Sequence, residues 1–211
     1  MNFADINGNN IDYDGQKDLL FITLPTKKSV NFIKKIKDGE LQNYTKECKI
    51  YLNSIEDAIL ATKALKQLNT LQEQKMKSNT TQISNLKQAV DKLNQLLQKV
   101  NIGEDNYDLF VEITDEATRS IKLTSTFSNL KKSVETVQEF SLNDINPKNC
   151  SIKVKGKHVI AALNTQHLEK IVKTYVDGQI KPYQYKVGIE AKGIEAAREI
   201  VTIVQSIAAN N

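Results

Sequence analysis

The stretch Asp144-Ile145-Asn146-Pro147-Lys148-Asn149 has an earlier counterpart in this chain, Asp5-Ile6-Asn7-Gly8-Asn9-Asn10. The two lie 139 residues apart (144 minus 5), and at this offset residues 1–72 align with residues 140–211 without a gap. Beyond the motif the identical pairs are Leu24 with Leu163, Thr26 with Thr165, Lys34 with Lys173, Asp38 with Asp177, Gly39 with Gly178, Tyr44 with Tyr183, Ile50 with Ile189, Ile55 with Ile194, Glu56 with Glu195 and Ala58 with Ala197. A fixed period of this kind predicts a repeat architecture.

The second copy, with the residues just before it, contains about seven segments whose alternating or β-branched residues are typical of strands. These are residues 108–113, 121–127, 133–142, 150–154, 159–163, 171–176 and 179–191. Residues 168–175 are also compatible with a short helix. The chain closes with residues 193–208, where Ile194, Ala197, Val201, Val204 and Ile207 form an apolar stripe at helical spacing. We therefore expect an α+β fold, an antiparallel sheet with a C-terminal helix.

Asp-Gly pairs mark the tightest predicted turns. Asp177-Gly178 separates two strand-like segments, and Asp38-Gly39 stands at the equivalent place in the first copy. Asp-Gly is a strong hairpin signal because a type I′ turn needs positive φ at both central residues. Pro182 lacks a backbone N–H, so it predicts an edge or a bulge in the returning strand.

The repeat predicts three regions in the chain. Residues 1–72 form a partial first copy with strands and a helix, residues 73–104 connect the copies, and residues 105–211 form a complete second copy. The first copy lacks the strand-like sequence that precedes residue 140. We therefore expect the chain to be a fragment, or to miss part of its first repeat. Such a copy would expose a sheet edge, which proteins normally pair or cover.

The connecting region predicts an amphipathic helix after a break at residues 75–81. Thr81 is a suitable N-cap, and an apolar seam follows at Ile83, Leu86, Val90, Leu93, Leu97 and Val100. The spacing of three and four residues fits a helix packed on the neighbouring sheet, and it also fits a short coiled-coil partner helix. Self-association through this helix, residues 81–101, or through the open edge of the first copy is a hypothesis that follows.

Seven strands closed by one helix resemble the pleckstrin-homology-like superfold. The resemblance covers residues 106–211 and rests on topology. Headgroup binding in such a fold would need several basic residues in the first hairpin loop, to neutralise phosphates. Here that loop, residues 114–120, contains Asp115 and Glu116 but only one base, Arg119. We therefore expect no phosphoinositide site, and since fold does not imply function no site residue carries over.

The composition is that of an ordinary soluble globular protein, with 26% charged and 40% hydrophobic residues. The net charge of +4 is small and the two signs are interspersed, which argues against nucleic-acid binding. No apolar run reaches the length of a membrane-spanning helix. The first residues, Met1-Asn2-Phe3-Ala4-Asp5, have neither the basic nor the apolar region of a signal peptide. These features leave the compartment undetermined.

The side chains that most often carry catalysis or bind metals are scarce. His158 and His167 stand at metal-ligand spacing from no cysteine or acid, which favours surface or structural roles. Cys48 and Cys150 each align with an aliphatic residue of the other copy, which is typical of small buried hydrophobic positions. We therefore predict no catalytic, cofactor-binding or metal-binding residue, and no cofactor.

Weaker candidates have simple structural explanations. The Lys-Gly-Lys triplet at residues 155–157 could contact phosphate, but residues 16–18 of the first copy are Gln-Lys-Asp, so a solvated turn is expected. Asp5 and Asp144 could supply oxygen ligands to a metal. We favour turn residues that hydrogen-bond their own backbone. The aligned tyrosines, Tyr44 and Tyr183, are expected to be half-buried in strands.

The sequence favours a non-enzymatic repeat module that binds a protein or a surface ligand, or acts as a scaffold. Tandem copies suit this role because they set valency and spacing. An alternative is a carrier of a small apolar ligand or lipid, with a cavity between sheet and helix. A third hypothesis, an enzyme whose catalytic half lies outside the chain, stays open.

Overall fold

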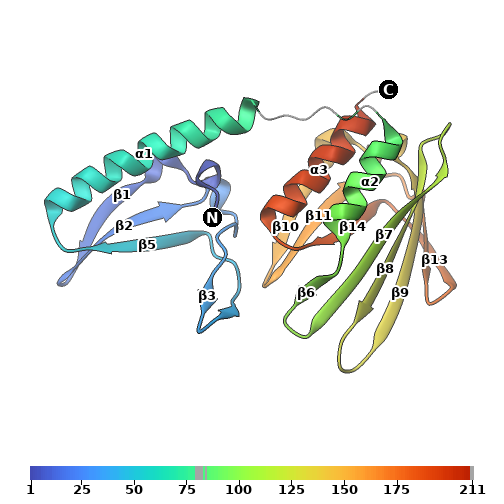
Figure 1. Cartoon of the computed structure of the whole chain (residues 1–211), viewed down its shortest axis with the longest axis horizontal. Helices are drawn as coiled ribbons and strands as arrows, with labels where there is room; N and C mark the ends of the chain where they lie inside the picture. The colour runs from blue at the N-terminus through green and yellow to red at the C-terminus, as the bar shows by residue number, and fades with distance from the viewer. Residues whose placement is uncertain (79–82, 84, 210–211) are drawn as a thin grey trace. The chain divides into compact units, whose positions relative to one another are not determined.

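The computed structural model describes residues 1–78, 83 and 85–209. The chain forms two compact units, Met1–Thr81 and Gln82–Asn211. Both combine antiparallel sheets with α-helices, which confirms the predicted α+β class and the C-terminal helix (Figure 1). None of the helices in the described part of the chain is long and apolar enough to cross a membrane.

The first unit is a small sheet covered by one long helix. Its elements are the 3₁₀ turns η1 (Phe3–Asp5), η2 (Gly8–Asn10) and η3 (Lys27–Ser29), the strands β1 (Asp12–Gln16), β2 (Leu19–Pro25), β3 (Ile36–Lys37), β4 (Glu40–Leu41) and β5 (Glu47–Leu52), and the helix α1 (Ile55–Ser78). Strands β1, β2 and β5 form one sheet in that order, and β3 pairs with β4 as a separate hairpin. The buried core contains Ile6, Ile11, Ile22, Leu24 and Ile33. Ala61 and Leu65 of α1 pack against it.

The second unit has two sheets and two helices. It contains α2 (Leu86–Leu97), β6 (Val100–Ile102), β7 (Asp105–Asp115), β8 (Ser120–Ser128), β9 (Ser133–Ser141), η4 (Leu142–Asp144), η5 (Pro147–Asn149), β10 (Ser151–Lys155), β11 (His158–Asn164), η6 (Gln166–Leu168), β12 (Val172–Val176), β13 (Gln179–Gln184), β14 (Lys186–Ala191) and α3 (Ile194–Ala208). One sheet has the order β10-β11-β14 and the other β13-β12-β9-β8-β7-β6. Helix α3 packs on β10, β11 and β14, and α2 packs on β7 and on α3 (Figure 1).

The predicted strand at residues 179–191 is wrong, because it is two strands in different sheets. β13 belongs to the six-stranded sheet and β14 to the three-stranded sheet. The chain changes sheet at Tyr185, whose carbonyl accepts a backbone hydrogen bond from Thr165 over 2.9 Å. Residues 105–211 therefore form eight strands, β7 to β14, one more than the seven segments expected from the sequence. Pro182 lies in the edge strand β13, beside a register shift opposite Val172 and Thr174, so both expectations for this proline are confirmed.

The turns and helices of the connecting region differ in part from expectation. Residues 75–78 continue α1 instead of breaking it, because three of these four residues, two Lys and one Met, have high helix propensity. Helix α2 begins at Leu86, and Asn85 caps it by accepting a hydrogen bond from the backbone N–H of Gln88. Thr81, the predicted cap, lies outside the described residues. The seam ends earlier than predicted because Val100 belongs to β6.

Both Asp-Gly turns are type I′ hairpins, as predicted. The backbone φ angles are 52° and 80° at Asp38 and Gly39, and 49° and 76° at Asp177 and Gly178. The two hairpins have different neighbours. β12 pairs with β9 of the larger sheet, whereas β3, its counterpart by alignment, pairs with β4 alone among the described strands. In the second unit the segment at 168–175 is accordingly not a helix: its second half, from Val172, belongs to β12, and Leu168 ends the η6 turn.

Candidate functional site

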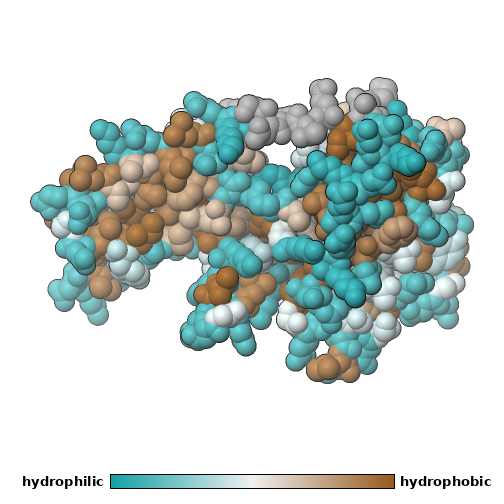
Figure 2. Space-filling model, viewed as in Figure 1, coloured by the Kyte–Doolittle hydropathy of each residue, from teal (hydrophilic) through white to brown (hydrophobic). Residues whose placement is uncertain are grey.

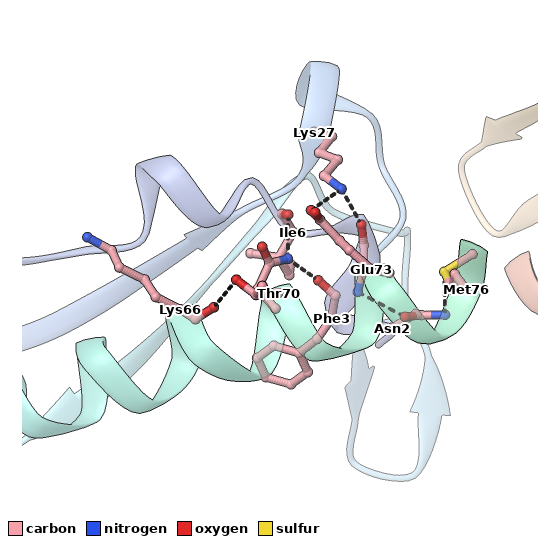
Figure 3. Close-up of polar contacts among 10 residues, drawn as sticks. Asn2, Phe3, Ile6, Lys27, Lys66, Thr70, Glu73 and Met76 are labelled. Atoms are coloured by element: carbon pink, nitrogen blue, oxygen red, sulfur yellow. Dashed lines mark hydrogen bonds and ion pairs between the residues drawn. The ribbon is translucent and has the colours of Figure 1, made fainter. Parts of the chain in front are cut away.

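Polar side chains in the first unit tie its first residues to α1 (Figure 3). Asn69 is buried, and its Nδ2 donates hydrogen bonds to the carbonyls of Phe3 (2.6 Å) and Ile6 (2.9 Å). The side chain lies so close to the η2 turn that a Cβ on Gly8 would come within 2.2 Å of Asn69 Oδ1. Glycine at this position therefore allows the turn to approach the helix.

A lysine completes this attachment. Lys27 Nζ donates to the carbonyl of Ala4 (2.7 Å) and pairs with Glu73 Oε1 of α1 at 2.5 Å (Figure 3). Lys27 and Glu73 border a polar hollow of about 380 Å³. In the second unit Gln166, at the position of Lys27, makes the same contact by donating to the carbonyl of Asn143 over 3.0 Å. The shared contact indicates an architectural role for this position.

A buried threonine occupies the same place in both units. The Thr26 hydroxyl lies 2.5 Å from the carbonyl of Val30 and 3.0 Å from that of Lys46. The Thr165 hydroxyl lies 2.7 Å from the carbonyl of Glu169 and 3.1 Å from that of Tyr185. Each threonine also forms an isolated bridge to the isoleucine of its own Asp-Ile-Asn motif, Ile6 or Ile145. The repeated motif thus meets the same partner in each unit.

The predicted turn residues Asp5 and Asp144 lie in the 3₁₀ turns η1 and η4. The side chains of neighbouring residues cap these turns: Asn2 accepts from the N–H of Ala4, and Ser141 accepts from the N–H of Asn143. In the second half of the motif, Asn146 caps η5. Turn formation in this motif therefore involves asparagine and serine side chains as caps.

His158 has acidic neighbours that its sequence context does not reveal. Its Nε2 lies 3.7 Å from Asp105 Oδ2, and its Nδ1 lies 3.7 Å from Glu190 Oε2. The edge of the Tyr107 ring meets the imidazole, with the ring centroids 6.1 Å apart. Asp105 and Tyr107 come from β7, whereas His158 and Glu190 come from β11 and β14. The cluster therefore joins the two sheets of the second unit.

Burial changes the proton affinity of this cluster. It raises the pKa of Glu190, and this effect exceeds the opposite effect of His158. Burial also raises the pKa of Tyr107 to about 12, and the charges of Glu190 and Asp105 add to the rise. A carboxyl group with a raised pKa beside a histidine is a common component of catalytic sites, but structural clusters show the same shifts. Within the described part of the chain, no group of three or more His, Cys, Asp or Glu side chains could hold a metal ion.

The other predicted candidates are not members of this cluster. His167 is exposed in η6 at a positive φ of 51°. Cys48 and Cys150 are free and partly buried. Burial raises the pKa of the Cys48 thiol, and raises that of Cys150 to about 11. Both thiols are therefore protonated at neutral pH, and the thiolate is the nucleophilic form.

The two loops considered for phosphate binding have structural roles. In the 114–120 loop, Asp115 Oδ1 accepts hydrogen bonds from the N–H groups of Ala117 and Thr118. Arg119 Nη1 donates to the carbonyl of Ile207, near the end of α3, over 3.0 Å. The Lys-Gly-Lys triplet at residues 155–157 forms the β10–β11 turn, where Gly156 has a φ of 63°.

The aligned tyrosines differ, so the expectation that both are half-buried in strands is wrong. Tyr44 is buried and lies outside any strand, whereas Tyr183 is exposed within β13. The difference follows from strand length, because β4 ends at Leu41 while β13 continues to Gln184. In the first unit the residues after the shorter hairpin return to the core. Thr45, next to Tyr44, forms a bridge with Ile33, which belongs to the buried core.

Helix α1 has more exposed large hydrophobic residues than any other element in the described part of the chain (Figure 2). They are Ile55, Ile59, Leu60, Leu68, Leu71 and Met76. Leu60, Leu68 and Leu71 share one face of the helix, whereas Ile55 and Ile59 lie on the other side. The corresponding helix α3 buries its aliphatic residues Ile194, Ile200, Val201, Ile203, Val204 and Ile207. A contiguous apolar surface on a folded protein marks an interaction site more often than isolated exposed residues do. The α1 surface is therefore the strongest candidate site, and sequence analysis missed it. A signal was available in the sequence, because the apolar residues of 55–76 lie on several sides of the helix and not along a single stripe.

A hollow of about 830 Å³ lies beside α2 and β7 in the second unit. Most of its lining residues are polar or charged, namely Asp91, Asn94, Gln95, Gln98, Lys99, Asp108 and Lys192, but with Leu109 and Phe110 the surface that they present to the hollow is mostly apolar. Asn94 reaches across it to the open edge of β7. Its Nδ2 donates to the carbonyl of Val111 (2.9 Å), and its Oδ1 accepts from the N–H of Val111 (2.8 Å). The Asn94 amide thus makes the two hydrogen bonds to Val111 that a neighbouring strand would otherwise make.

No protein-family model matches this chain, and no curated protein or solved structure is significantly similar to it. The resemblance to the pleckstrin-homology-like superfold therefore stays a prediction.

Proposed function

We propose that the chain is a non-enzymatic interaction module, built as an internal repeat, that binds protein through the exposed face of α1. One observation carries the proposal. Helices α1 and α3 correspond by alignment, and a face that is buried on α3 is exposed on α1. Leu68 is 37% exposed, whereas Ile207 at the aligned position is 1% exposed.

Matching local structure supports the internal repeat. The threonine hydrogen bonds recur, and so do unusual backbone angles at aligned positions. The φ angle is 53° at Lys28 and 51° at His167, which aligns with it. The next pair, Ser29 and Leu168, has φ angles of 52° and 58°. Positive φ is uncommon for residues other than glycine. Two aligned pairs of such residues therefore favour a common ancestry of the two units over coincidence.

The chemistry of the surfaces favours protein over a small apolar ligand. A carrier site is normally concave and mostly apolar. The hollow beside α2 has polar or charged side chains at most of its lining positions, and the exposed apolar residues of α1 lie on the outer surface of a helix. An amphipathic helix surface is a usual contact for another protein element. These features support the interaction module over the carrier.

Site-specific photocrosslinking tests the proposal. A photoreactive amino acid at position 64, on the exposed face of α1, should form covalent adducts with protein in cells that make this chain naturally. The same residue at position 130 is the control, because Leu130 is exposed in the β8–β9 turn of the second unit. Adducts to lipid only, or equal protein adducts from both positions, would overturn the proposal.

A further inference from the structure

Four exposed residues form one row along α1: Leu60, Ala64, Leu68 and Leu71. Their spacing of four, four and three residues keeps them on one face, because an α-helix has 3.6 residues per turn. Asp57 precedes Leu60 by three residues and Lys75 follows Leu71 by four, so these two charged residues lie at the ends of the same row. Both are exposed.

The second unit shows what covers this row. At the aligned positions of α3, Ile203 replaces Ala64 and Ile207 replaces Leu68, and both isoleucines are buried. Glu199 replaces Leu60 and pairs with Lys92 of α2, with Nζ and Oε1 3.1 Å apart. Helix α2 therefore packs along this face of α3. In the second unit the element beside this face is therefore a helix.

The row on α1 is complementary to itself when it is reversed. If two copies of α1 run antiparallel about a two-fold axis between Ala64 and Leu68, then Leu60 of each copy faces Leu71 of the other. Ala64 then faces Leu68, so that a small residue lies opposite a large one. In the same register Asp57 of each copy faces Lys75 of the other, which places opposite charges together at both ends.

We propose that the partner of the α1 row is α1 of a second copy of this chain, in this antiparallel arrangement. The inference rests on the proposed function, since it names the protein that the α1 face binds. A two-fold interface must be self-complementary, and the reversed pairing of both the apolar and the charged residues meets that requirement. One helix face is a small interface, so the dimer should be weak and depend on concentration.

Sedimentation velocity on the full chain tests the apolar row. From about 1 to about 200 µM, the wild-type protein should change from monomer to dimer. Leu68→Lys should keep the chain monomeric across this range, because a lysine would face Ala64 of the other copy. Ile59→Lys is the matched control, since Ile59 is 51% exposed on α1 but lies outside the row. Circular dichroism should show that both variants stay folded.

Charge reversal tests the orientation. Asp57→Lys and Lys75→Asp should each weaken dimerisation about tenfold or more, which corresponds to about 1.4 kcal/mol or more. The double variant should recover most of the wild-type affinity, because antiparallel packing pairs the reversed charges again. Asp18→Lys, in the exposed β1–β2 turn, changes the net charge equally and should have no effect.

Each outcome decides the inference. A wild-type chain that stays monomeric to about 200 µM, or a dimer that survives Leu68→Lys, would overturn the second copy as the partner. A dimer that the double charge reversal fails to restore would overturn the antiparallel register. In all these cases, crosslinks from position 64 to a different protein would still support the proposed function. If position 64 crosslinks to no protein at all, both the proposed function and the dimer are overturned.

Discussion

At the scale of single residues, Thr26 and Thr165 hold the most informative position in the chain. Each is buried, and each joins three segments that are distant in sequence: the Asp-Ile-Asn motif, its own turn and the strand that returns to the sheet. A threonine hydroxyl has one hydrogen to donate. In Thr165 this hydrogen is donated to the nearer carbonyl, that of Glu169 at 2.7 Å.

Replacing this hydroxyl should be costly. Thr165→Val keeps the shape of the side chain but leaves the carbonyl of Glu169 without its hydroxyl donor, so we expect a loss of about 1–3 kcal/mol in the free energy of unfolding. Urea denaturation measures it. Thr165→Ser keeps the hydroxyl and should lose less. If valine and serine unfold at the same midpoint, the hydrogen bond contributes nothing to stability.

At the scale of elements, the two Asp-Gly hairpins are alike in their turns and different in their surroundings. Asp177 is fixed to β9: its N–H donates to the carbonyl of Glu135, and its Oδ1 accepts from the N–H of Glu135, both over 2.9 Å. The β3–β4 hairpin has two residues in each strand, and no other described strand pairs with it. The same turn therefore supports a large sheet in one unit and a short hairpin in the other.

This difference predicts unequal effects of the same substitution. Gly178 and Gly39 have open space beside them, so a valine meets no neighbour but is strained by the positive φ. We expect Gly178→Val to lower the stability of the second unit by about 1–3 kcal/mol. Gly39→Val should mainly open its local hairpin and shift the urea midpoint less. Hydrogen exchange at residues 36–41 detects the local opening. A wild-type midpoint for Gly178→Val would contradict the strain argument.

At the scale of the whole molecule, the chain divides into two compact units whose cores differ in size. Leu24 and Leu163 occupy aligned positions, and both are fully buried. In the first unit Leu24 belongs to a core covered by α1, the one α-helix that the structure describes there, whereas the sheets of the second unit pack against α2 and α3. A smaller core buries less apolar area and is less stable.

We therefore expect two thermal transitions, with the first unit unfolding at the lower temperature. Leu24→Ala should lower only the first transition and Leu163→Ala only the second, each by a loss of about 2–5 kcal/mol from the cavity it creates. Differential scanning calorimetry on the full chain resolves the two. A single transition that both substitutions lower equally would show that the units unfold together.

Local chemistry explains which expectations came true. Alternating residues, Asp-Gly turns and the apolar stripe of residues 194–207 depend on neighbours in sequence, and the structure contains these strands, turns and helix. The strand at residues 179–191 failed because the change of sheet at Tyr185 depends on Thr165, which lies 20 residues away. The His158 cluster was invisible for the same reason, since Asp105 and Glu190 are brought to it only by the sheets.

The sequence by itself determined the local features of this protein: most of its strands, both Asp-Gly turns and the closing helix of residues 194–208. These features follow from backbone geometry and residue spacing. Tertiary structure alone decided which surfaces are covered. Leu68 and Ile207 are both large aliphatic residues at aligned positions of a helix, and nothing local distinguishes them. Their exposure differs because burial depends on what packs against the helix, and α2 lies along α3 within the second unit.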